Sequence, residues 1–150
     1  MAQVPEGSLS VVERVAALHR VQLFADIPGR VLAAVAEAAV EERFSPGGLL
    51  MEEAAVEAHL YAIVDGHVRV HRDGRTLVEL GPGATVGELA VLVPAPRTAS
   101  VTALDETLVL RVDQAVLDDL LVDWPELAQG VIAELVSRLR ATTEFAEQAS

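Results

Sequence analysis

The chain has 150 residues, 51% of them hydrophobic, which is enough for one compact domain with a buried core. Its formal net charge of −12 disfavours the electrostatic attraction that most nucleic-acid and anionic-membrane binders use. It contains no cysteine, and all 11 basic residues are arginine, which excludes disulfides, Schiff-base lysines and a lysine-containing phosphate-binding loop. We expect no nucleic-acid partner, no direct membrane contact by this chain, and a cytoplasmic location, alone or as the cytoplasmic part of a larger protein.

Two helices are predicted before any strand. The segment Ser10-Val11-Val12-Glu13 matches a capping box, and apolar residues follow at helical spacing, so a first helix should run to about Arg20. A second helix is predicted from about Gly29 to Val40. The sequence Ser45-Pro46-Gly47-Gly48 then predicts a turn.

Residues 49–112 have the alternating, β-branched pattern of short strands. Turns are predicted at Asp65-Gly66, Asp73-Gly74 and Gly81-Pro82-Gly83, so the strands should form an antiparallel meander. We therefore expect an α+β fold: an antiparallel eight-stranded β-barrel or jelly roll flanked by N-terminal helices and two C-terminal helices.

Two helices should close the chain. Asp113 is a candidate cap for the first, and the second begins at Pro125 with an apolar stripe of Leu127, Val131, Leu135 and Leu139. The stripe fits either core packing or the seam of a homodimer, and the last residues, 141–150, should be frayed. The whole chain, 1–150, is expected to be one domain, with a helical part at 8–40, a β-roll at 41–112 and C-terminal helices at 113–147.

One stretch, from Gly87 to Val101, combines unusual residues. Arg97 shares the strand parity of Ala99, Val101 and Ala103, so in a regular strand its guanidinium would point to an apolar interior and need an anionic partner. Glycine at position 87 permits a tight turn whose free N–H groups bind anions, and Glu88 adds an acceptor for a hydroxyl. A ligand with one phosphate charge and one nearby hydroxyl meets these requirements.

This stretch, G-E-L-A-V-L-V-P-A-P-R-T-A-S-V, resembles the phosphate-binding cassette of cyclic-nucleotide-binding domains, a family that includes catabolite-activator-type regulators, cyclic-nucleotide-dependent kinases and cyclic-nucleotide-gated channels. The resemblance extends over roughly Leu18 to Arg140. It includes several further motifs: Leu23-Phe24, the segment from Arg43-Phe44 to Gly48, Leu60-Tyr61-x-Ile63, Gly66-x-Val68-x-Val70 and Leu80-Gly81-x-Gly83.

The resemblance implies a regulatory domain that binds cyclic AMP or cyclic GMP as its ligand and needs no other cofactor. Glu88 would accept the ribose 2′-hydroxyl, without a protein partner of its own, and Arg97 would pair with the cyclic phosphate. The remaining ligand-binding residues would be Gly87, Leu89, Ala90, Thr98 and Ala99. Cyclic AMP is the expected preference over cyclic GMP. The signal would pass through the terminal helices to an effector on the same or an associated chain.

Several alternatives remain open. The family commonly has Gly-Asp where this chain has Ala54-Ala55. This difference motivates the alternative that the chain is a degenerate domain, which no longer binds ligand and serves for protein interaction or dimerisation. Arg97 and Glu88 could instead form a structural ion pair. A metal-dependent enzyme would have to use His67, His71 and Glu79. We expect no catalytic residues, no metal and no enzyme activity, because no nucleophile, base and orienting group can be assigned.

Overall fold

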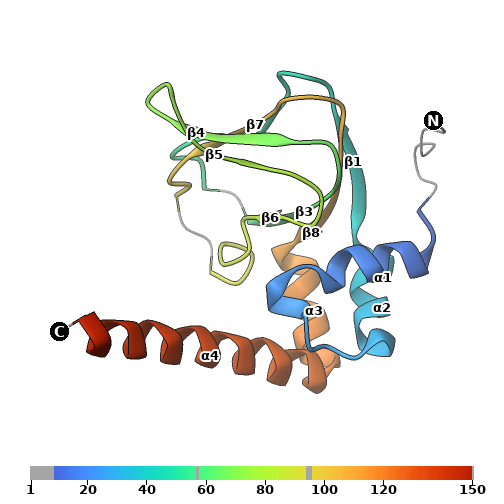
Figure 1. Ribbon diagram of the computed structural model, residues 1–150. Coiled ribbons are helices and arrows are strands. Elements are labelled where there is room, and N and C mark those ends of the chain that lie inside the picture. The colour runs from blue at the N-terminus through green and yellow to red at the C-terminus, as the bar shows by residue number, and fades with distance from the viewer. Residues whose placement is uncertain (1–8, 57, 94–95, 150) are drawn as a thin grey trace.

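The computed structural model describes residues 9–56, 58–93 and 96–149 (Figure 1). Two α-helices and a short 3₁₀ helix precede eight strands, and two further helices end the chain. The helices are α1 (Val11–His19), η1 (Gln22–Phe24), α2 (Gly29–Ala38), α3 (Gln114–Asp123) and α4 (Pro125–Ala149). The strands are β1 (Val40–Phe44), β2 (Leu49–Met51), β3 (His59–Asp65), β4 (Val68–Arg72), β5 (Arg75–Leu80), β6 (Thr85–Val86), β7 (Ser100–Ala103) and β8 (Thr107–Asp113).

The strands form two four-stranded antiparallel sheets, in the orders β1-β8-β3-β6 and β2-β7-β4-β5. The predicted α+β class with antiparallel strands between helical flanks is confirmed, as a roll of two sheets rather than a closed barrel. The predicted meander is wrong: β4 and β5 are the only consecutive strands that pair among the described residues, and β3 and β4, which the Asp65-Gly66 turn connects, lie in different sheets. The second helix was predicted to reach Val40, which is wrong: α2 ends at Ala38 and Val40 already pairs with Arg111 in β8.

The central strands β3 and β8 are buried on both faces, and they separate two hydrophobic clusters. On β3, Leu60 and Ala62 face the cluster that contains the helices, whereas Tyr61 and Ile63 face the interior of the roll. Because successive side chains of a strand point to opposite faces, these strands need continuous apolar runs, and their sequences have them. The helices are therefore packed against a sheet that also forms one wall of the roll.

The tight turn between β4 and β5 follows the predicted chemistry. Asp73 and Gly74 both have positive φ, 54° and 75°, as a two-residue turn of type I′ requires. The resulting hairpin projects from the second sheet (Figure 1).

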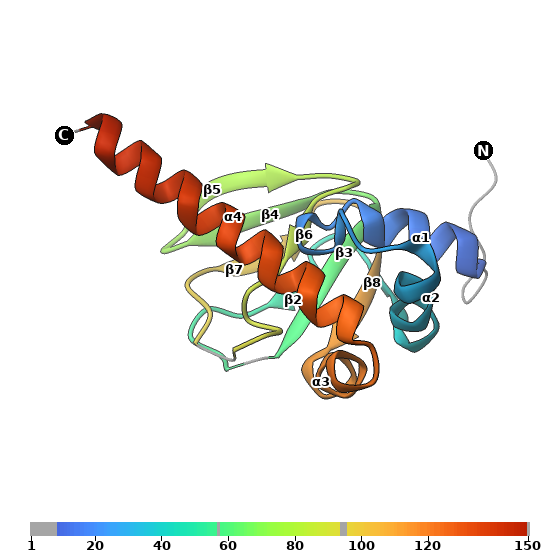
Figure 2. The same cartoon turned by 90° about the horizontal axis from the view of Figure 1, so that it is seen from below.

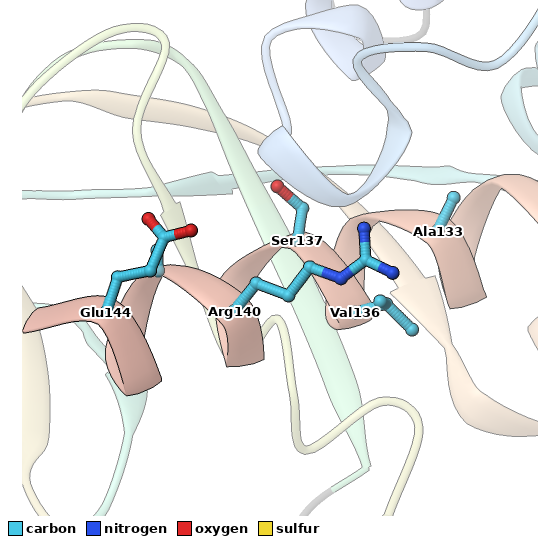
Figure 3. A pocket seen from close by; sticks show the side chains of 6 residues that line it. Ala133, Val136, Ser137, Arg140 and Glu144 are labelled. Atoms are coloured by element: carbon cyan, nitrogen blue, oxygen red, sulfur yellow. The ribbon is translucent and has the colours of Figure 1, made fainter. Parts of the chain in front are cut away.

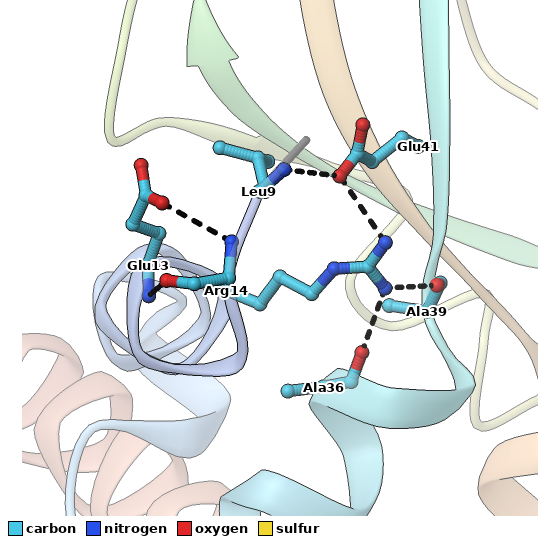
Figure 4. Close-up of polar contacts among 7 residues, drawn as sticks. Leu9, Glu13, Arg14, Ala36, Ala39 and Glu41 are labelled. Atoms are coloured by element: carbon cyan, nitrogen blue, oxygen red, sulfur yellow. Dashed lines mark hydrogen bonds and ion pairs between the residues drawn. The ribbon is translucent and has the colours of Figure 1, made fainter. Parts of the chain in front are cut away.

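The first helix is fastened to the roll by Arg14 (Figure 4). Its capping box forms as predicted, with Ser10 and Glu13 satisfying each other's backbone N–H groups. The Arg14 guanidinium donates to the carbonyl oxygens of Ala36 at 3.0 Å and Ala39 at 2.7 Å and pairs with Glu41 at 3.1 Å. The carbonyls at the end of α2 lack partners within their own helix, so Arg14 satisfies them and joins α1 to α2 and β1.

The last helix, α4, is longer than predicted. It is helical over 25 residues to Ala149, so the expected fraying after Ala141 is wrong, while Ser150 lies outside the described residues. It crosses the underside of the roll, and its C-terminal end extends past the sheets (Figure 2). Its apolar stripe divides: Leu127 and Val131 are buried in the core, Leu135 packs against it, and Leu139 is exposed. Within the part of the chain that is described, no helix combines the length and the hydropathy needed to span a membrane.

The predicted capping role of Asp113 is not observed. Asp113 occupies the N-cap position of α3, but its side chain makes no capping hydrogen bond. Its carboxylate accepts instead from Arg111 Nε at 2.8 Å and lies 2.9 Å from His59 Nδ1. The Asp113 side chain thus pairs with Arg111 of the same strand, β8, instead of capping α3.

Candidate ligand site

A reversal of the chain at Gly87 begins the candidate site. The short strand β6 ends at Val86, and Gly87 has φ of +79°, a conformation that favours glycine. A Cβ at this position would lie 2.3 Å from the carbonyl oxygen of His59 and 2.7 Å from Met51 Cε. Only glycine therefore fits where the loop passes this close to the start of β3.

The loop after Gly87 forms hydrogen-bonded turns rather than a regular helix. Val91 donates its N–H to the Gly87 carbonyl at 3.1 Å, and its side chain is fully buried in the helical cluster. Within residues 9–56, 58–93 and 96–149, the N–H groups of Glu88, Leu89 and Ala90 donate to no protein acceptor. Among the described residues, the first turn of the loop thus leaves these three N–H groups without an acceptor, and such groups at the start of a helical turn can bind an anion.

Arg97 points inward, but for a different reason from the one predicted. The strand β7 begins only at Ser100, so strand parity does not orient Arg97. Its backbone is held by the loop before β3: Arg97 N donates to Ala55 O at 3.0 Å, and Ala54 N donates to Arg97 O at 2.8 Å. These two backbone bonds position the side chain, which leaves the residue 8% exposed.

The guanidinium of Arg97 has unused donors. Nη2 donates to the carbonyl oxygen of His59 at 2.9 Å, whereas Nε is buried without a hydrogen-bond partner. No carboxylate among the described residues forms an ion pair with it. A buried guanidinium in this state is costly unless an anion joins it, so the site has the features of a receptor for a negatively charged group.

The Ala54-Ala55 departure leaves the support of Arg97 in place. Both alanines bond to the Arg97 backbone, as described above. Ala54 adopts φ of +70°, where a side chain is strained by about 1–2 kcal/mol and glycine is not. The substitution therefore adds strain to the loop without removing the contacts that the loop makes.

Glu88 lies close to Arg97 in the sequence but does not pair with it. Its Oε1 accepts from Leu23 N at 2.9 Å and forms an ion pair with Arg138 of α4, while Oε2 accepts from Thr85 Oγ1 at 3.2 Å. The expectation that Glu88 lacks a protein partner is therefore wrong. The structural ion pair between Arg97 and Glu88 is not formed either. No local sequence signal indicated the contacts with Leu23 and Arg138, because these partners come from η1 and α4.

A cavity of about 840 Å³ opens between the roll and α4. This volume is within the range of roughly 300–1,000 Å³ that small-ligand sites occupy. All the residues predicted to bind ligand line it: Gly87, Glu88, Leu89, Ala90, Arg97, Thr98 and Ala99. Apolar residues complete much of the wall, among them Met51, Val70, Val86, Val101 and Leu135. The structure thus brings together every candidate residue around one space of suitable size.

Arg138 is a cavity residue that the sequence analysis missed. It lies four residues after Glu134, and Arg138 Nε donates to Glu134 Oε1 at 3.2 Å, so the pattern indicates an ordinary pair on a helix surface. Burial lowers the pKa of Arg138, but its hydrogen bonds to Glu88 and Glu134 outweigh this and raise the pKa above the usual value. Among the described residues that line the cavity there are thus two guanidinium groups and one carboxylate, a local excess of positive charge in an acidic chain.

The two histidines considered for a metal-dependent enzyme have other partners. His67 bonds to Asp105, whose pKa this contact lowers, and His71 bonds to Thr102. The described residues include no group of three or more side chains that could hold a metal ion. A second hollow of about 500 Å³ lies on the outer face of α4 and is lined by Ala133, Val136, Ser137, Arg140, Ala141 and Glu144 (Figure 3). All of these residues come from one helix, so the hollow is an exposed helix surface and not an enclosed pocket.

Comparison with known proteins agrees with this geometry. The family profile described as "Cyclic nucleotide-binding domain" matches residues 41–123. The chain is 31% identical over 130 residues to the CRP-like cAMP-activated global transcriptional regulator of Mycobacterium tuberculosis, covering 83% of this chain and 58% of that protein. It is 34% identical over 112 residues to the Pycsar effector protein PaPycTIR of Pseudomonas aeruginosa, covering 74% of this chain and 36% of that protein.

A solved structure shows the same fold over most of the chain. The N-terminal domain of a transcriptional regulator from Streptomyces coelicolor superposes with a TM-score of 0.82 at 32% identity, covering 87% of this chain and 94% of that one. The chain therefore spans a little more than half of the length of the Mycobacterium tuberculosis regulator and about a third of the length of PaPycTIR. By its sequence profile, its relatives and its fold, the chain belongs to the family of cyclic nucleotide-binding domains.

Proposed function

We propose that this domain is a sensor of a 3′,5′-cyclic mononucleotide, with a binding and not a catalytic role. The observation that carries the proposal is Arg97, an 8% exposed guanidinium with an unpaired Nε at the wall of an 840 Å³ cavity. A single phosphodiester charge matches one such arginine together with the free N–H groups of the loop after Gly87. A more highly charged phosphate would require more cations than Arg97 and Arg138.

The role of each residue follows from this match. Arg97 would bind the cyclic phosphate. The backbone of Gly87, Leu89 and Ala90 would complete the phosphate pocket, together with Thr98 and Ala99. Glu88 would accept the 2′-hydroxyl, which is the free ribose hydroxyl in a 3′,5′-cyclic nucleotide. We propose cyclic AMP over cyclic GMP; the support is the name of the Mycobacterium tuberculosis relative, a cAMP-activated regulator.

The signal would leave through the terminal helices. Glu88 contacts η1 through Leu23 and α4 through Arg138, so a ligand bound to this carboxylate would be linked through it to both helical parts of the domain. We propose that 1–150 acts as one regulatory domain, in the cytoplasm, whose effector lies on the same or an associated chain. A fold without cysteine requires no oxidising compartment.

Ligand binding should stabilise the folded domain. At about 100 times its dissociation constant, a ligand that binds only the folded state adds about 2.7 kcal/mol to the free energy of unfolding, which raises the melting temperature by several degrees. We expect this shift with cyclic AMP, a smaller one at equal concentration of cyclic GMP, and far less with inorganic phosphate. An unchanged melting temperature and no binding heat with millimolar cyclic AMP and cyclic GMP would contradict the sensor and favour the degenerate domain.

A homodimer formed through α4 is a second proposal, and the outer face of that helix favours it. Ile132, Val136 and Leu139 are 59%, 39% and 67% exposed and are spaced by four and three residues, as in the seam of a two-helix coiled coil. A second copy presents the same stripe and can cover it.

Light scattering should give twice the chain mass of 15.9 kDa. Leu139→Glu should give the monomer, whereas Val122→Glu, at an equally apolar position that is 81% exposed on α3, should not.

A further inference from the structure

The carboxylate of Glu88 is already engaged before any ligand reaches it. It accepts from Leu23 N, Thr85 Oγ1 and Arg138 Nη2. An ionised carboxylate has about four acceptor positions, so three donors leave room for about one more, and that donor must approach in a narrow range of directions. The side chain of Glu88 is 16% exposed, so few directions of approach are open.

The three donors approach Glu88 from different sides. Leu23 belongs to η1 and Thr85 to β6, and neither residue lines the cavity. Arg138 does line the cavity, and its guanidinium reaches Oε1 from there. A ligand hydroxyl must come from the same side. Leu23 and Thr85 suffice to orient the carboxylate, one on each oxygen, so Arg138 is not needed for its position.

We propose that Arg138 competes with the ligand for Glu88 and thereby limits how strongly the site distinguishes a ribose from a deoxyribose. This inference rests on the proposed function and adds a specificity-determining residue to it. In the free domain Arg138 holds Glu88, and a ligand with a 2′-hydroxyl must weaken or displace that ion pair, whereas a 2′-deoxy ligand gains nothing by doing so.

Displacement is feasible because Arg138 has a second partner. Glu134 accepts from Arg138 Nε at 3.2 Å, four residues earlier on the same helix, and remains available when Nη2 leaves Glu88. The Arg138 side chain is 29% exposed, so its charge is not left buried and unpaired. Loss of this ion pair also removes a polar contact between α4, which crosses the roll (Figure 2), and the loop after Gly87.

A thermodynamic cycle tests the competition. The wild type and Arg138→Gln are each titrated calorimetrically with cyclic AMP and with 2′-deoxy cyclic AMP, and the readout is the ratio of the two dissociation constants. Loss of a positive charge weakens both anionic ligands alike, so it cancels in the ratio. We expect the preference for cyclic AMP over the 2′-deoxy ligand to rise roughly three- to fivefold in Arg138→Gln. This factor corresponds to the free energy of a partly exposed ion pair, which the ligand no longer has to break.

The matched control is Arg140→Gln, which removes the same charge from the outer face of α4 and should leave the ratio unchanged. An unchanged ratio in Arg138→Gln would overturn the competition. A reduced ratio would also overturn it and would make Arg138 a residue that positions Glu88. A wild type that binds neither ligand would refute the proposed function itself, which separates the two failures.

Discussion

Replacing Arg97 by alanine should nearly abolish binding of any 3′,5′-cyclic nucleotide. The variant removes the guanidinium of Arg97, a residue that lines the cavity and whose buried Nε has no hydrogen-bond partner, and leaves the phosphate with backbone donors and the charge of Arg138. Loss of one partner from a desolvated charge pair costs about 2–5 kcal/mol, which is tens- to thousands-fold in affinity. Calorimetric titration with cyclic AMP measures the loss directly.

Two further measurements separate a binding role of Arg97 from a structural one. Arg97→Lys should recover only part of the affinity, because an ammonium keeps the charge but lacks the planar fork that matches two phosphate oxygens. The melting temperature of the free domain should change little in Arg97→Ala, since loss of the hydrogen bond to His59 O is offset by relief of the buried, unpaired Nε. A large fall in melting temperature with unchanged affinity would assign Arg97 to the scaffold.

Replacing Gly87 by alanine should damage both stability and binding. The φ of +79° adds strain of about 1–2 kcal/mol, and the new Cβ would lie 2.3 Å from the His59 carbonyl oxygen, a backbone atom that cannot turn away. Overpacking of this kind costs a further 1–3 kcal/mol or so. Together these effects should lower the melting temperature by roughly 5–15 °C. Binding should weaken too, because the His59 carbonyl is the acceptor for Arg97 Nη2.

Gly47→Ala isolates the contribution of backbone strain. Gly47 has φ of +87°, but a Cβ there would meet nothing within 4 Å, and the residue does not line the cavity. It should lower stability by the strain alone, about 1–2 kcal/mol, and leave the affinity for cyclic AMP unchanged. Equal losses of stability in the two variants would contradict the close contact assigned to Gly87.

The fold was largely predictable because its determinants are local. The capping box at Ser10, the turn at Asp73-Gly74 and the alternation of apolar residues depend on neighbours within a few positions, and each has the structure that its chemistry predicts. The boundaries that failed depend on competition between elements. Val40 leaves its helix because β8 offers it a strand partner, and α4 continues beyond Arg140 because no residue there ends it.

The site was determined by the sequence only in part. The residue types of the Gly87–Val101 segment indicated an anion receptor with a hydroxyl acceptor beside it, but they left open a structural ion pair between Arg97 and Glu88. Tertiary structure decided the rest. It holds Arg97 by backbone bonds to a loop some forty residues away, and it brings Leu23 and Arg138 to one oxygen of Glu88. Contacts across such distances in the chain depend on how the helices pack against the roll, and no local pattern in the sequence records that packing.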